Sequence, residues 1–494
     1  MPITFLSLLI LAIFTFVIVT ATLEKLNKAV VSLIGAIAVY ILLTRLRGLS
    51  FHDIIMFEDF SVLITIIGIA IIVEVIREAG IFQYIAIRAV KLSRGDAIPL
   101  YVVLAIMTFV LSAFTASIAT IIIMGTLTIA ISRTLRINPT PYLVTEAILV
   151  DVGGMIFMFS SLPNIILAEK VGLSPSFFIV YIFPYAMLSL LISLYFFYRY
   201  FRHTFEEADI IRKTFLMEFD EWVVVKDRKV FVRSTLIFLF IICGFFLFPH
   251  ELALVALGGG IALLVLTELP IEEILGKVDW ETVFFFAGIF IIVGGLEHEG
   301  LLGEIGKMFG LFVGNNVLLA VLLTLWLVGL LSGLIDNIPI TIAFIPVIQS
   351  LITYSGLESY ALILWASIVI ATNVGGNLIP YGSPTTVLML GISRRGGHPI
   401  RPREFMDIGI KWTILHIGVG TMYIVAIIFL SYIIALVGLV IFLALTLSLI
   451  VMLIVFIVHV TVGIRRFIDL LTETIEKAKR SMSEHSTRSQ KTKK

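Results

Sequence analysis

The stretch LSAFTASIATIIIM, residues 111–124, recurs about 220 residues later as LSGLIDNIPITIAF, residues 331–344. A second pair follows in the same order, DVGG at 151–154 and NVGG at 373–376. Both pairs place polar residues inside apolar surroundings, and a tandem duplication is the simplest explanation. In a membrane protein, a repeat interrupted by Gly, Pro and polar residues at matching places is typical of a secondary transporter and indicates its binding site.

Isolated glycines repeat at the same offset. Gly68 pairs with Gly288 and Gly80 with Gly300, so the register holds over some 90 residues before it slips by two. The duplication therefore extends well beyond the two polar motifs.

The composition places the chain in a lipid bilayer. Hydrophobic residues make up 60% of the sequence, charged residues make up 14%, and the mean hydropathy is +1.11. One soluble core could not bury so much apolar surface. A net charge of +1 gives no reason to expect nucleic acid, and the single cysteine, Cys243, excludes an intrachain disulfide framework. Residues 3–22 lack a basic start, which favours a retained first transmembrane helix over a cleaved signal peptide.

Eleven stretches are apolar over the length that a bilayer requires, about 20 residues, so we expect an all-α polytopic membrane protein. They are residues 3–22, 28–44, 60–76, 139–168, 177–198, 231–248, 252–268, 280–296, 359–391, 412–432 and 434–459. Two further apolar regions, 97–133 and 317–352, carry the duplicated motif near their middles. We predict that each is a re-entrant helical hairpin with the polar motif at its tip. The alternative is two full crossings joined by a short polar turn.

The distribution of basic residues predicts the orientation. Lys and Arg concentrate in 77–95, 199–233, 394–411 and the tail after Arg465, and such segments usually stay cytoplasmic. Eleven spans place all four on one side, with the N-terminus outside and the C-terminus in the cytoplasm. Segment 77–95 then faces inward while its repeat partner, 297–315, faces outward. The halves are therefore predicted to be inverted repeats, which permit alternating access.

These assignments divide the chain into five parts. They are an inverted repeat at 1–200, a cytoplasmic connector at 201–230, a second repeat at 231–432, an additional transmembrane helix at 433–460 and a polar cytoplasmic tail at 461–494.

Each half also contains a predicted helix break. FSSLPN at 159–164 includes Pro163, which cannot donate a backbone hydrogen bond and clashes with the preceding turn. The helix that begins near Pro141 should therefore break here, after Gly153-Gly154. GGNLIPYGSPTT at 375–386 corresponds to it and carries two prolines. Irregular backbone survives at membrane depth only where protein or a water-filled cavity surrounds it. We therefore expect the breaks and the hairpin tips to form the binding site; a proline kink without function is the alternative.

The candidate site has two half-sites, whose hydroxyls and amides at helix N-termini suit an anion and whose carboxylates and carbonyls suit a cation. The first comprises Ser112, Thr115, Ser117, Asp151, Ser160, Ser161 and Asn164, and the second comprises Ser332, Asp336, Asn337, Thr341, Asn373, Asn377, Ser383, Thr385 and Thr386.

Carboxylates at membrane depth narrow this choice, because an ionised one costs several kcal/mol unless it is paired, hydrated or protonated. Asp151 and Asp336 lie inside the duplicated motifs and are the candidates for coupling to a cation or a proton. Sodium is the metal considered, near Asp336, Asn337 and Asn377. No cofactor other than the coupling ion is expected.

Three other ionisable residues are expected to have structural roles. Glu146 should snorkel or cap near the cytoplasmic interface, and Glu74 should do the same near the inner end of its helix. For His416 we expect an interhelical hydrogen bond rather than a proton relay.

The motifs resemble those of the ion transporter superfamily, in particular its arsenite-permease and NhaD-type sodium/proton antiporter branch. That branch includes the melanosomal P protein and is related to citrate and dicarboxylate carriers. LSGLIDNIPITIAFIPVI, from residue 331, is similar to the family's S-x-x-x-D-N-x-P element, and GGNLIPYGSPTT to its GGN…G-x-S element. The resemblance covers about 55–410. It implies a scaffold and a transport domain in each protomer, elevator-type movement and a homodimer.

The first half departs from the family pattern. Met155 to Phe159 replace polar residues of the family, and Ala116-Ser117 stand where Asp-Asn is common. These departures weaken the expectation of a complete first cation site.

We therefore expect an ion-coupled secondary active transporter of a small anion or oxyanion, arsenite-like or a carboxylate, in a cell membrane. Sodium/proton antiport is the alternative, and a passive channel is a more distant one. An enzyme is not expected, because the sequence has no HExxH, no paired His at ligand spacing and no Gly-x-Ser-x-Gly. The expected partners are the bilayer and the solute, without nucleic acid.

Overall fold

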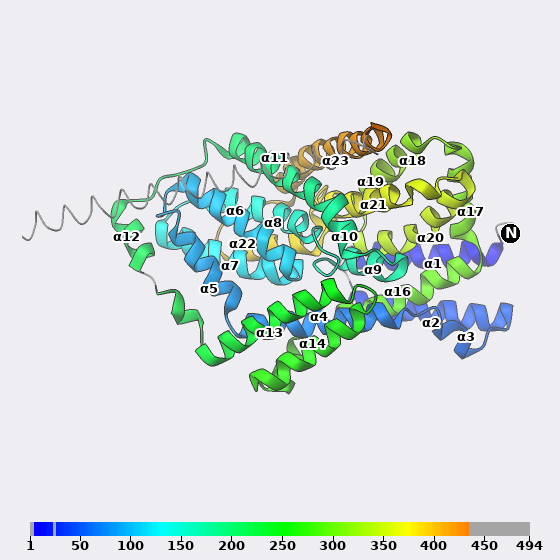
Figure 1. The fold of residues 1–494 in the computed structure, drawn as a ribbon, viewed down its shortest axis with the longest axis horizontal. Coiled ribbons are helices and arrows are strands. Elements are labelled where there is room, and N and C mark those ends of the chain that lie inside the picture. The colour runs from blue at the N-terminus through cyan, green and yellow to red at the C-terminus, as the bar shows by residue number, and fades with distance from the viewer. Residues whose placement is uncertain (1–3, 23–25, 219, 434–494) are drawn as a thin grey trace, which may run out of the picture. The chain divides into compact units, whose positions relative to one another are not determined.

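The structure is a computed structural model that describes all residues except 1–3, 23–25, 219 and 434–494. The chain divides into two units, 1–425 and 426–494, and the residues of the candidate site belong to the first. Its described residues form helices and no strand (Figure 1). Of the predicted additional helix at 433–460 only residue 433 is described, and the predicted tail lies outside the described residues.

Twelve helices of the described part are long and apolar enough to cross a bilayer, which makes this a multi-pass membrane protein. The first half contains α1 (Phe5–Thr22), α2 (Lys28–Arg47), α3 (Phe51–Ile55), α4 (Phe60–Glu78), α5 (Ile81–Lys91), α6 (Ala97–Phe114), α7 (Ser117–Leu135), α8 (Thr140–Gly154), α9 (Leu162–Val171), α10 (Pro175–Phe177), the π-helix η1 (Phe178–Ile182) and α11 (Phe183–Phe201). The connector holds α12 (Ile210–Glu218) and η2 (Glu221–Val224). The second half contains α13 (Arg228–Leu247), α14 (Leu252–Thr267), α15 (Ile271–Lys277), α16 (Trp280–His298), α17 (Leu301–Val313), α18 (Val317–Leu323), the π-helix η3 (Thr324–Val328), α19 (Gly329–Leu334), α20 (Asn337–Ser355), η4 (Glu358–Tyr360), α21 (Ala361–Gly375), η5 (Pro380–Gly382), α22 (Pro384–Arg395) and α23 (Pro402–Ile433).

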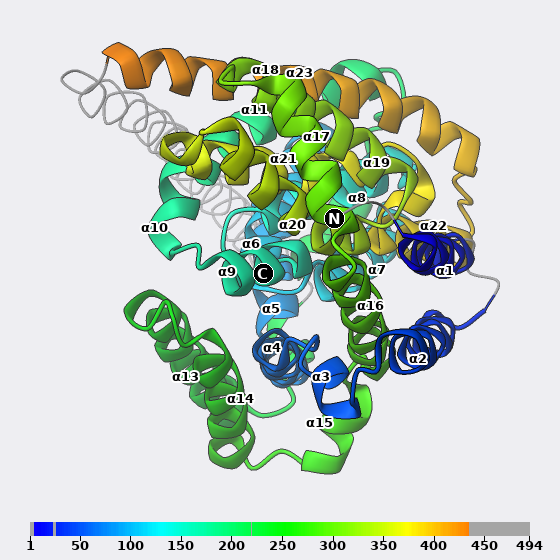
Figure 2. The same ribbon diagram turned by 90° about the vertical axis from the view of Figure 1, so that its right-hand side faces the viewer.

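The duplicated glycines make equivalent contacts in the two halves. Helix α4 packs on α14, and its partner α16 packs on α2 (Figure 2). A Cβ atom on Gly68 would lie 2.4 Å from the backbone of Ala256, and one on Gly288 would lie 2.6 Å from the backbone of Ser32. The hydrophobic effect does not drive helices together inside a bilayer, because lipid tails are as apolar as the helix surfaces. Close backbone packing at small residues therefore holds such helix pairs together.

Gly80 and Gly300 also have one structural role. Each precedes a short helix, α5 or α17, with φ of +78° or +76°. A left-handed conformation favours glycine, because a Cβ atom would crowd the backbone there. The chain therefore turns in the same way after α4 and after α16.

Two helix pairs occupy the regions that carry the duplicated motif, α6 with α7 and α18–α19 with α20, and in each the motif lies at the turn between the helices. Each of these four helical segments is long enough to cross a bilayer, so re-entrance stays a prediction. Each hairpin is bonded to its own broken helix through the duplicated serine: Ser112 Oγ donates to the carbonyl of Val150, and Ser332 Oγ donates to the carbonyl of Thr372, at 3.0 Å in the second case. Gly153 and Gly375 allow the backbones to meet, since a Cβ atom would lie 2.2 Å from the Phe109 oxygen or 2.1 Å from the Gly329 oxygen.

The helix breaks are present, but proline is not where they begin. Helix α8 ends at Gly154, well before Pro163, and α21 ends at Gly375. Pro163 and Pro384 instead stand in the first turns of α9 and α22. Proline is well tolerated there, because the N–H that it lacks has no partner within the helix. The predicted break after Gly153-Gly154 is therefore confirmed, but Pro163 begins the next helix and does not end the first.

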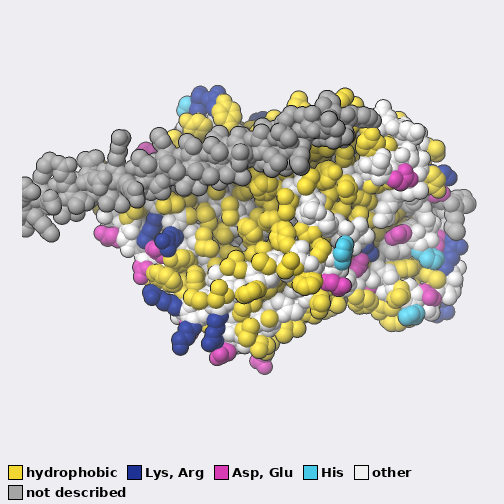
Figure 3. Space-filling model, viewed as in Figure 1, with side chains coloured by type: hydrophobic (Ala, Val, Ile, Leu, Met, Phe, Trp, Pro, Cys, Tyr) yellow, Lys and Arg dark blue, Asp and Glu magenta, His cyan; other side chains and the backbone are white. Residues whose placement is uncertain are grey.

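The visible face in Figure 3 has the surface of a membrane protein. Hydrophobic side chains predominate across its middle, and charged side chains gather toward its two ends. Apolar side chains such as Phe240, Leu254 and Met422 are exposed, as expected for helices that face lipid.

We predict that Gly68→Ala destabilises the protein while Gly258→Ala does not. The added methyl group at 68 meets the α14 backbone, and such overpacking typically costs about 1–3 kcal/mol. Gly258, on α14, has no other atom within 4 Å of an added Cβ, so the helix propensity of alanine should make that variant neutral or slightly stabilising. Thermal unfolding of the two purified variants in one detergent measures the difference; equal melting temperatures would contradict the packing described here.

Candidate functional site

The two helix breaks meet, and this contact joins the two half-sites. Asn373 Nδ2 donates to Asn164 Oδ1 at 3.3 Å, and Thr385 Oγ1 donates to Asp151 Oδ1 at 3.3 Å. Each hydrogen bond links a residue of the first half to a residue of the second. Residues that lie 209 and 234 positions apart in sequence therefore belong to one site.

Asn164 holds the first break in shape. Its Nδ2 lies 3.2 Å from the carbonyl oxygen of Gly154, 3.0 Å from that of Met155 and 2.9 Å from that of Phe157. These carbonyls lost their helical partners where α8 ends. Ser160 Oγ also contacts the Gly154 and Phe157 oxygens, at 2.6 and 2.7 Å. Backbone groups that have no water in hydrocarbon are thereby satisfied by side chains.

The second break is held in a similar way. Asn377 Nδ2 donates to the carbonyl of Asn373 at 3.2 Å, and the hydroxyls of Ser383 and Thr385 are 2.7 Å apart. In the adjoining hairpin, Thr341 Oγ1 donates to the Asn337 carbonyl at 2.7 Å. Asp336 is half-buried and caps α20 by accepting from the backbone N–H of Ile338 at 3.0 Å.

A cavity of about 320 Å³ lies where the breaks and the hairpin tips converge. Half of the candidate residues line it: Ser117, Asp151, Ser160, Ser161, Asn337, Asn373, Ser383 and Thr385. The remainder support its wall and tips from behind: Ser112, Thr115, Asn164, Ser332, Asp336, Thr341, Asn377 and Thr386. Thr115 Oγ1, for example, contacts the Leu111 carbonyl at 3.0 Å and the Thr120 hydroxyl.

Four buried oxygen atoms of these candidates have no hydrogen-bond partner in the described part of the chain. They are Asp151 Oδ2, Ser161 Oγ, Asn377 Oδ1 and Thr386 Oγ1. Buried polar atoms are rarely left in this condition, so each marks a place where a ligand or water can complete the bonding. Of the residues that bear them, Asp151 and Ser161 line the cavity, whereas Asn377 and Thr386 do not. A carboxylate and a hydroxyl oxygen are ligand types of a hard cation such as sodium. The described residues contain no group of three or more His, Cys, Asp and Glu that could hold a metal.

Four helix N-termini are directed to the same cavity. The first residues of α7, α9, α20 and α22 line it: Ser117, Leu162, Asn337 and Pro384. Ala116, Ser161 and Ser383 precede three of these helices without a capping hydrogen bond from their side chains. Uncapped N–H groups and the positive end of the helix dipole favour a negatively charged ligand.

The apolar segment of the first break contributes one aromatic ring, that of Phe159, to the cavity lining. Phe159 stacks on Phe245 of α13 with ring centroids 4.6 Å apart, and on Phe157 at 5.5 Å. The departure from the family pattern in this segment therefore has a packing role, because it fastens the first break to α13.

Residues that sequence reasoning missed form one end of the cavity. Arg77 and Lys277 line it beside Glu74 and Asp279, and the side chains of Arg77 and Lys277 are 28% and 31% exposed. The segments that bear them, the end of α4 and α15, lie on the predicted cytoplasmic side. A signal was present in the sequence, since Asp279 repeats Asp59 at the offset of 220 that the glycines share.

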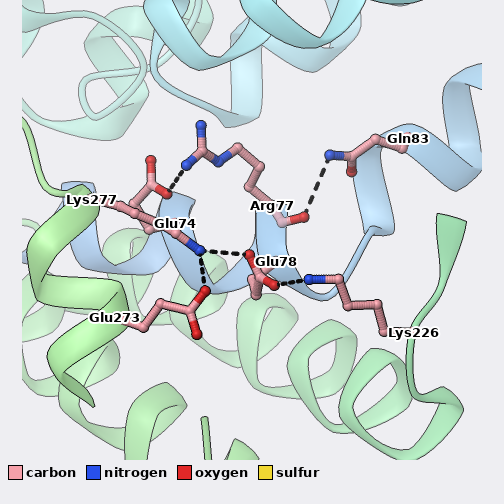
Figure 4. Close-up of polar contacts among 7 residues, drawn as sticks. All are labelled: Glu74, Arg77, Glu78, Gln83, Lys226, Glu273 and Lys277. Atoms are coloured by element: carbon pink, nitrogen blue, oxygen red, sulfur yellow. Dashed lines mark hydrogen bonds and ion pairs between the residues drawn. The ribbon is translucent and has the colours of Figure 1, made fainter. Parts of the chain in front are cut away.

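Ion pairs surround this mouth (Figure 4). Arg77 bonds to Glu74, and Lys277 lies 3.0 Å from Glu78 and 2.6 Å from Glu273. Lys226 of the connector bonds to Glu78 as well, and Gln83 Nε2 donates to the Arg77 carbonyl at 3.4 Å. The two basic side chains at the mouth are therefore neutralised by acidic neighbours. Glu74, expected to snorkel or cap, instead takes part in this network.

Polar contacts between α9 and the start of α4 lie on the predicted outer side. Lys170 Nζ lies 3.1 Å from Asp59 Oδ2, and Thr65 Oγ1 donates to Glu169 Oε1 at 2.7 Å. These four residues are not among those that line the cavity. Helix α17 packs along α20 on this predicted outer side, with Gly306 against the Val347 backbone, whereas the equivalent α5 makes few contacts with α7. Equivalent helix pairs of the two halves are therefore packed unequally.

The remaining ionisable residues gave one expected and one unexpected result. His416 is buried, with Nδ1 2.9 Å from the Trp412 carbonyl and Nε2 3.1 Å from Ser193 Oγ on α11, which is the interhelical hydrogen bond that we predicted. The interfacial role predicted for Glu146 was wrong, because its side chain is fully buried and accepts from Thr128.

Comparison with known proteins places this arrangement in a defined group. The sequence pattern of the citrate transporter family, CitMHS, matches residues 14–370. An uncharacterized transporter of Mycobacterium tuberculosis is 31% identical over 424 residues, covering 84% of this chain and 97% of that protein. The P protein of Mus musculus is 25% identical over 480 residues, covering 81% of this chain and 58% of that protein.

Two solved structures share the fold. The YdaH transporter of Alcanivorax borkumensis has a TM-score of 0.55 at 13% identity. The match covers 86% of this chain and 99% of the YdaH chain. MtrF of Neisseria gonorrhoeae, from a class of antimetabolite efflux pumps, has a TM-score of 0.54 at 10% identity. The match covers 86% of this chain and 95% of the MtrF chain.

We predict that Asn164→Ala destabilises the protein more than Ser161→Ala does. Removing the amide leaves the carbonyl oxygen of Met155 without a side-chain donor, whereas Ser160 Oγ still contacts those of Gly154 and Phe157. A buried unsatisfied group costs about 1–3 kcal/mol. Ser161 Oγ has no hydrogen-bond partner, so its removal frees no protein group. Unfolding of both variants in mixed micelles measures this, and an Asn164→Ala variant as stable as Ser161→Ala would overturn the assignment.

Proposed function

Because this chain belongs to the citrate transporter family, we propose that it is an ion-coupled secondary active transporter that moves a small anion or oxyanion, arsenite-like or a carboxylate. The family and its relatives are transporters rather than enzymes. One observation carries the proposal: residues of both half-sites line a single cavity. The partly exposed Arg77 and Lys277 line it on the predicted cytoplasmic side, whereas Lys170 and Asp59 pair on the predicted outer side without lining it. We infer that the first side is open and the second closed. A site that is accessible from one side at a time is what active transport requires, whereas a channel needs a continuous pore.

The charges around the cavity support coupling. Four helix N-termini favour an anion, while the carboxylate of Asp151 repels it. A cation bound in the cavity at the free oxygens of Asp151 and Ser161 would offset that carboxylate. Anion and cation then bind better together than separately, and each raises the affinity for the other by the same factor. Sodium suits these oxygens, and a proton on Asp151 would serve the same purpose.

Movement between two orientations is supported by the repeat. Asp59 of α4 pairs with Lys170 near the end of α9 on the closed side. The equivalent of Asp59 is Asp279 at the open mouth, and the helix equivalent to α9 is α22, which ends in the exposed Arg394 and Arg395. We propose that an elevator-type displacement of the hairpins and broken helices separates the first ion pair and brings Asp279 to an arginine of α22.

Transport in proteoliposomes under separately imposed sodium, proton and voltage gradients tests the function. Carboxylate or arsenite accumulation driven by one of these gradients is expected. Sodium movement coupled to protons without any anion would establish the antiporter alternative, and flux that follows only the gradient of the solute itself would exclude coupling.

We predict that Asp151→Asn uncouples transport or abolishes it, because the variant loses the charge that requires a cation. Anion uptake should lose its dependence on sodium or proton gradients by at least tenfold. Asp53→Asn is the matched control, since Asp53 is exposed and caps α3. Unchanged cation dependence in Asp151→Asn would remove this carboxylate from the coupling mechanism.

We predict that Lys170→Gln favours opening of the closed side. The Cys243→Ser variant has no cysteine. In this background, a Ser161→Cys substitution reports access to the cavity. Labelling by a membrane-impermeant thiol reagent applied on the side of Lys170 should become several-fold faster than in the Lys170 background. Lys411→Gln, which breaks an exposed ion pair with Asp407, should not change the labelling rate. An equal effect of both variants would contradict the proposal that the Lys170–Asp59 ion pair holds this side closed.

A further inference from the structure

Glu146 is a buried carboxyl group that the proposed anion and cation sites do not use. Its side chain is 0% exposed on α8. Oε1 accepts a hydrogen bond from Thr128 Oγ1 of α7 at 2.5 Å, and Oε2 is buried without a hydrogen-bond partner. The residue lies between the two ends of α8, about 7.5 Å along the axis from Asp151.

Helices α6, α7, α11, α21 and α22 pack against α8, and their ionisable side chains are engaged or directed elsewhere. Tyr101 of α6 donates to the Leu194 carbonyl at 2.9 Å, and Tyr185 of α11 donates to the His416 carbonyl at 2.9 Å. Arg133 of α7 lies 3.1 Å from the Gly396 carbonyl. The other ionisable residues on these helices are exposed, whereas Glu146 is fully buried; they are Tyr195, Tyr198, Arg199, Tyr200, Arg394 and Arg395.

On α8 itself, two more ionisable groups accompany Glu146. Tyr142 hydroxyl contacts the Ala97 carbonyl at 3.4 Å, and Asp151 accepts from Thr385 at the cavity. Among the described residues no Lys, Arg or His forms an ion pair with Glu146. Within the described part of the chain, Thr128 supplies the hydrogen bond to Oε1, and Oε2 has no donor.

An ionised carboxylate in these surroundings would have one hydroxyl donor and an uncompensated second oxygen. Buried charges persist in proteins only when they are paired or fully hydrogen-bonded, and a group that lacks such partners takes up a proton instead. The neutral carboxylic acid is therefore the form that is compatible with the packing of α7 on α8.

We propose that Glu146 is a proton-binding site, distinct from the anion site, whose occupation is required for α7 and α8 to pack closely. Ionisation loosens this contact, because the carboxylate needs water or a cation that the packed helices exclude. Both helices lead to the cavity: α7 begins with Ser117, and α8 carries Asp151. Binding of one proton at Glu146 thereby stabilises the geometry of the first half-site. The link to transport rests on the proposed function, whereas the protonation does not.

The stability of the purified protein across pH tests the proton site without any transport measurement. Unfolding releases the proton when the pH exceeds the range in which an exposed Glu is protonated, so stability falls as pH rises. One proton changes the ratio of folded to unfolded protein about tenfold per pH unit. Glu146→Gln, which keeps the shape of the neutral acid, should remove this one-proton dependence between about pH 5 and the pH at which Glu146 ionises in the folded state. Glu272→Gln, at an exposed position on α15, should retain it.

Thr128→Val supplies a second variant if Glu146→Gln does not fold. It leaves the carboxyl in place but removes the hydroxyl that would stabilise the ionised form, so the decline in stability should continue to a higher pH than in the wild type. The same slope in wild type and Glu146→Gln, or no change in Thr128→Val, would overturn the proposal.

Transport distinguishes this proposal from the function on which it rests. Proteoliposomes should show anion uptake by Glu146→Gln with at least a threefold weaker dependence on external pH than wild type. If no solute is transported by either protein, the proposed function fails while the stability measurement still decides the proton site.

Discussion

The hydrogen bonds of Asn164 are the interaction on which the rest of the site depends. A helix that stops inside a membrane exposes carbonyl oxygens that no water can satisfy, and one amide serves three of them at the end of α8. The Oδ1 of the same amide accepts from Asn373 of the other half. The shape of the first break and its attachment to the second break therefore have one cause, and the cavity can exist only because both are fixed.

Around that junction, duplication supplies equal parts that the chain uses unequally. Gly153 and Gly375 allow the same close approach, and Ser112 and Ser332 donate to equivalent carbonyls. The contacts of the two helix pairs differ, since α17 packs along α20 while α5 makes few contacts with α7. If each half can adopt the packing of the other, the protein has two conformations that are mirror-like in their packing. Their free energies can be nearly equal, because the two halves are similar.

The parts of the fold that depend on local constraints could be predicted from the sequence. Gly68, Gly80 and their partners were visible as a repeat because backbone approach and positive φ tolerate little except glycine. The roles of Glu146 and Lys277 could not be predicted in this way. A lone carboxylate in a helix has the same local sequence whether it faces lipid headgroups or a neighbouring helix, and ion pairs between segments some 200 residues apart depend on tertiary contacts. Sequence pattern also placed the cause of the first break at Pro163, although a proline in a first turn marks where a helix starts.

The inequality of the half-sites constrains what can be transported. In the first half Asp151 stands where the second has Asn373, and Phe157 and Phe159 replace polar lining. A symmetrical pair of cation sites is therefore absent from the residues that line the cavity. Away from the mouth, where Glu74 and Asp279 lie, Asp151 is the one carboxylate of the lining beside four positive helix ends, and Phe159 adds an apolar surface. The charge of the lining away from the mouth therefore comes from helix dipoles and one carboxylate, because Arg77 and Lys277 are both paired with acidic neighbours.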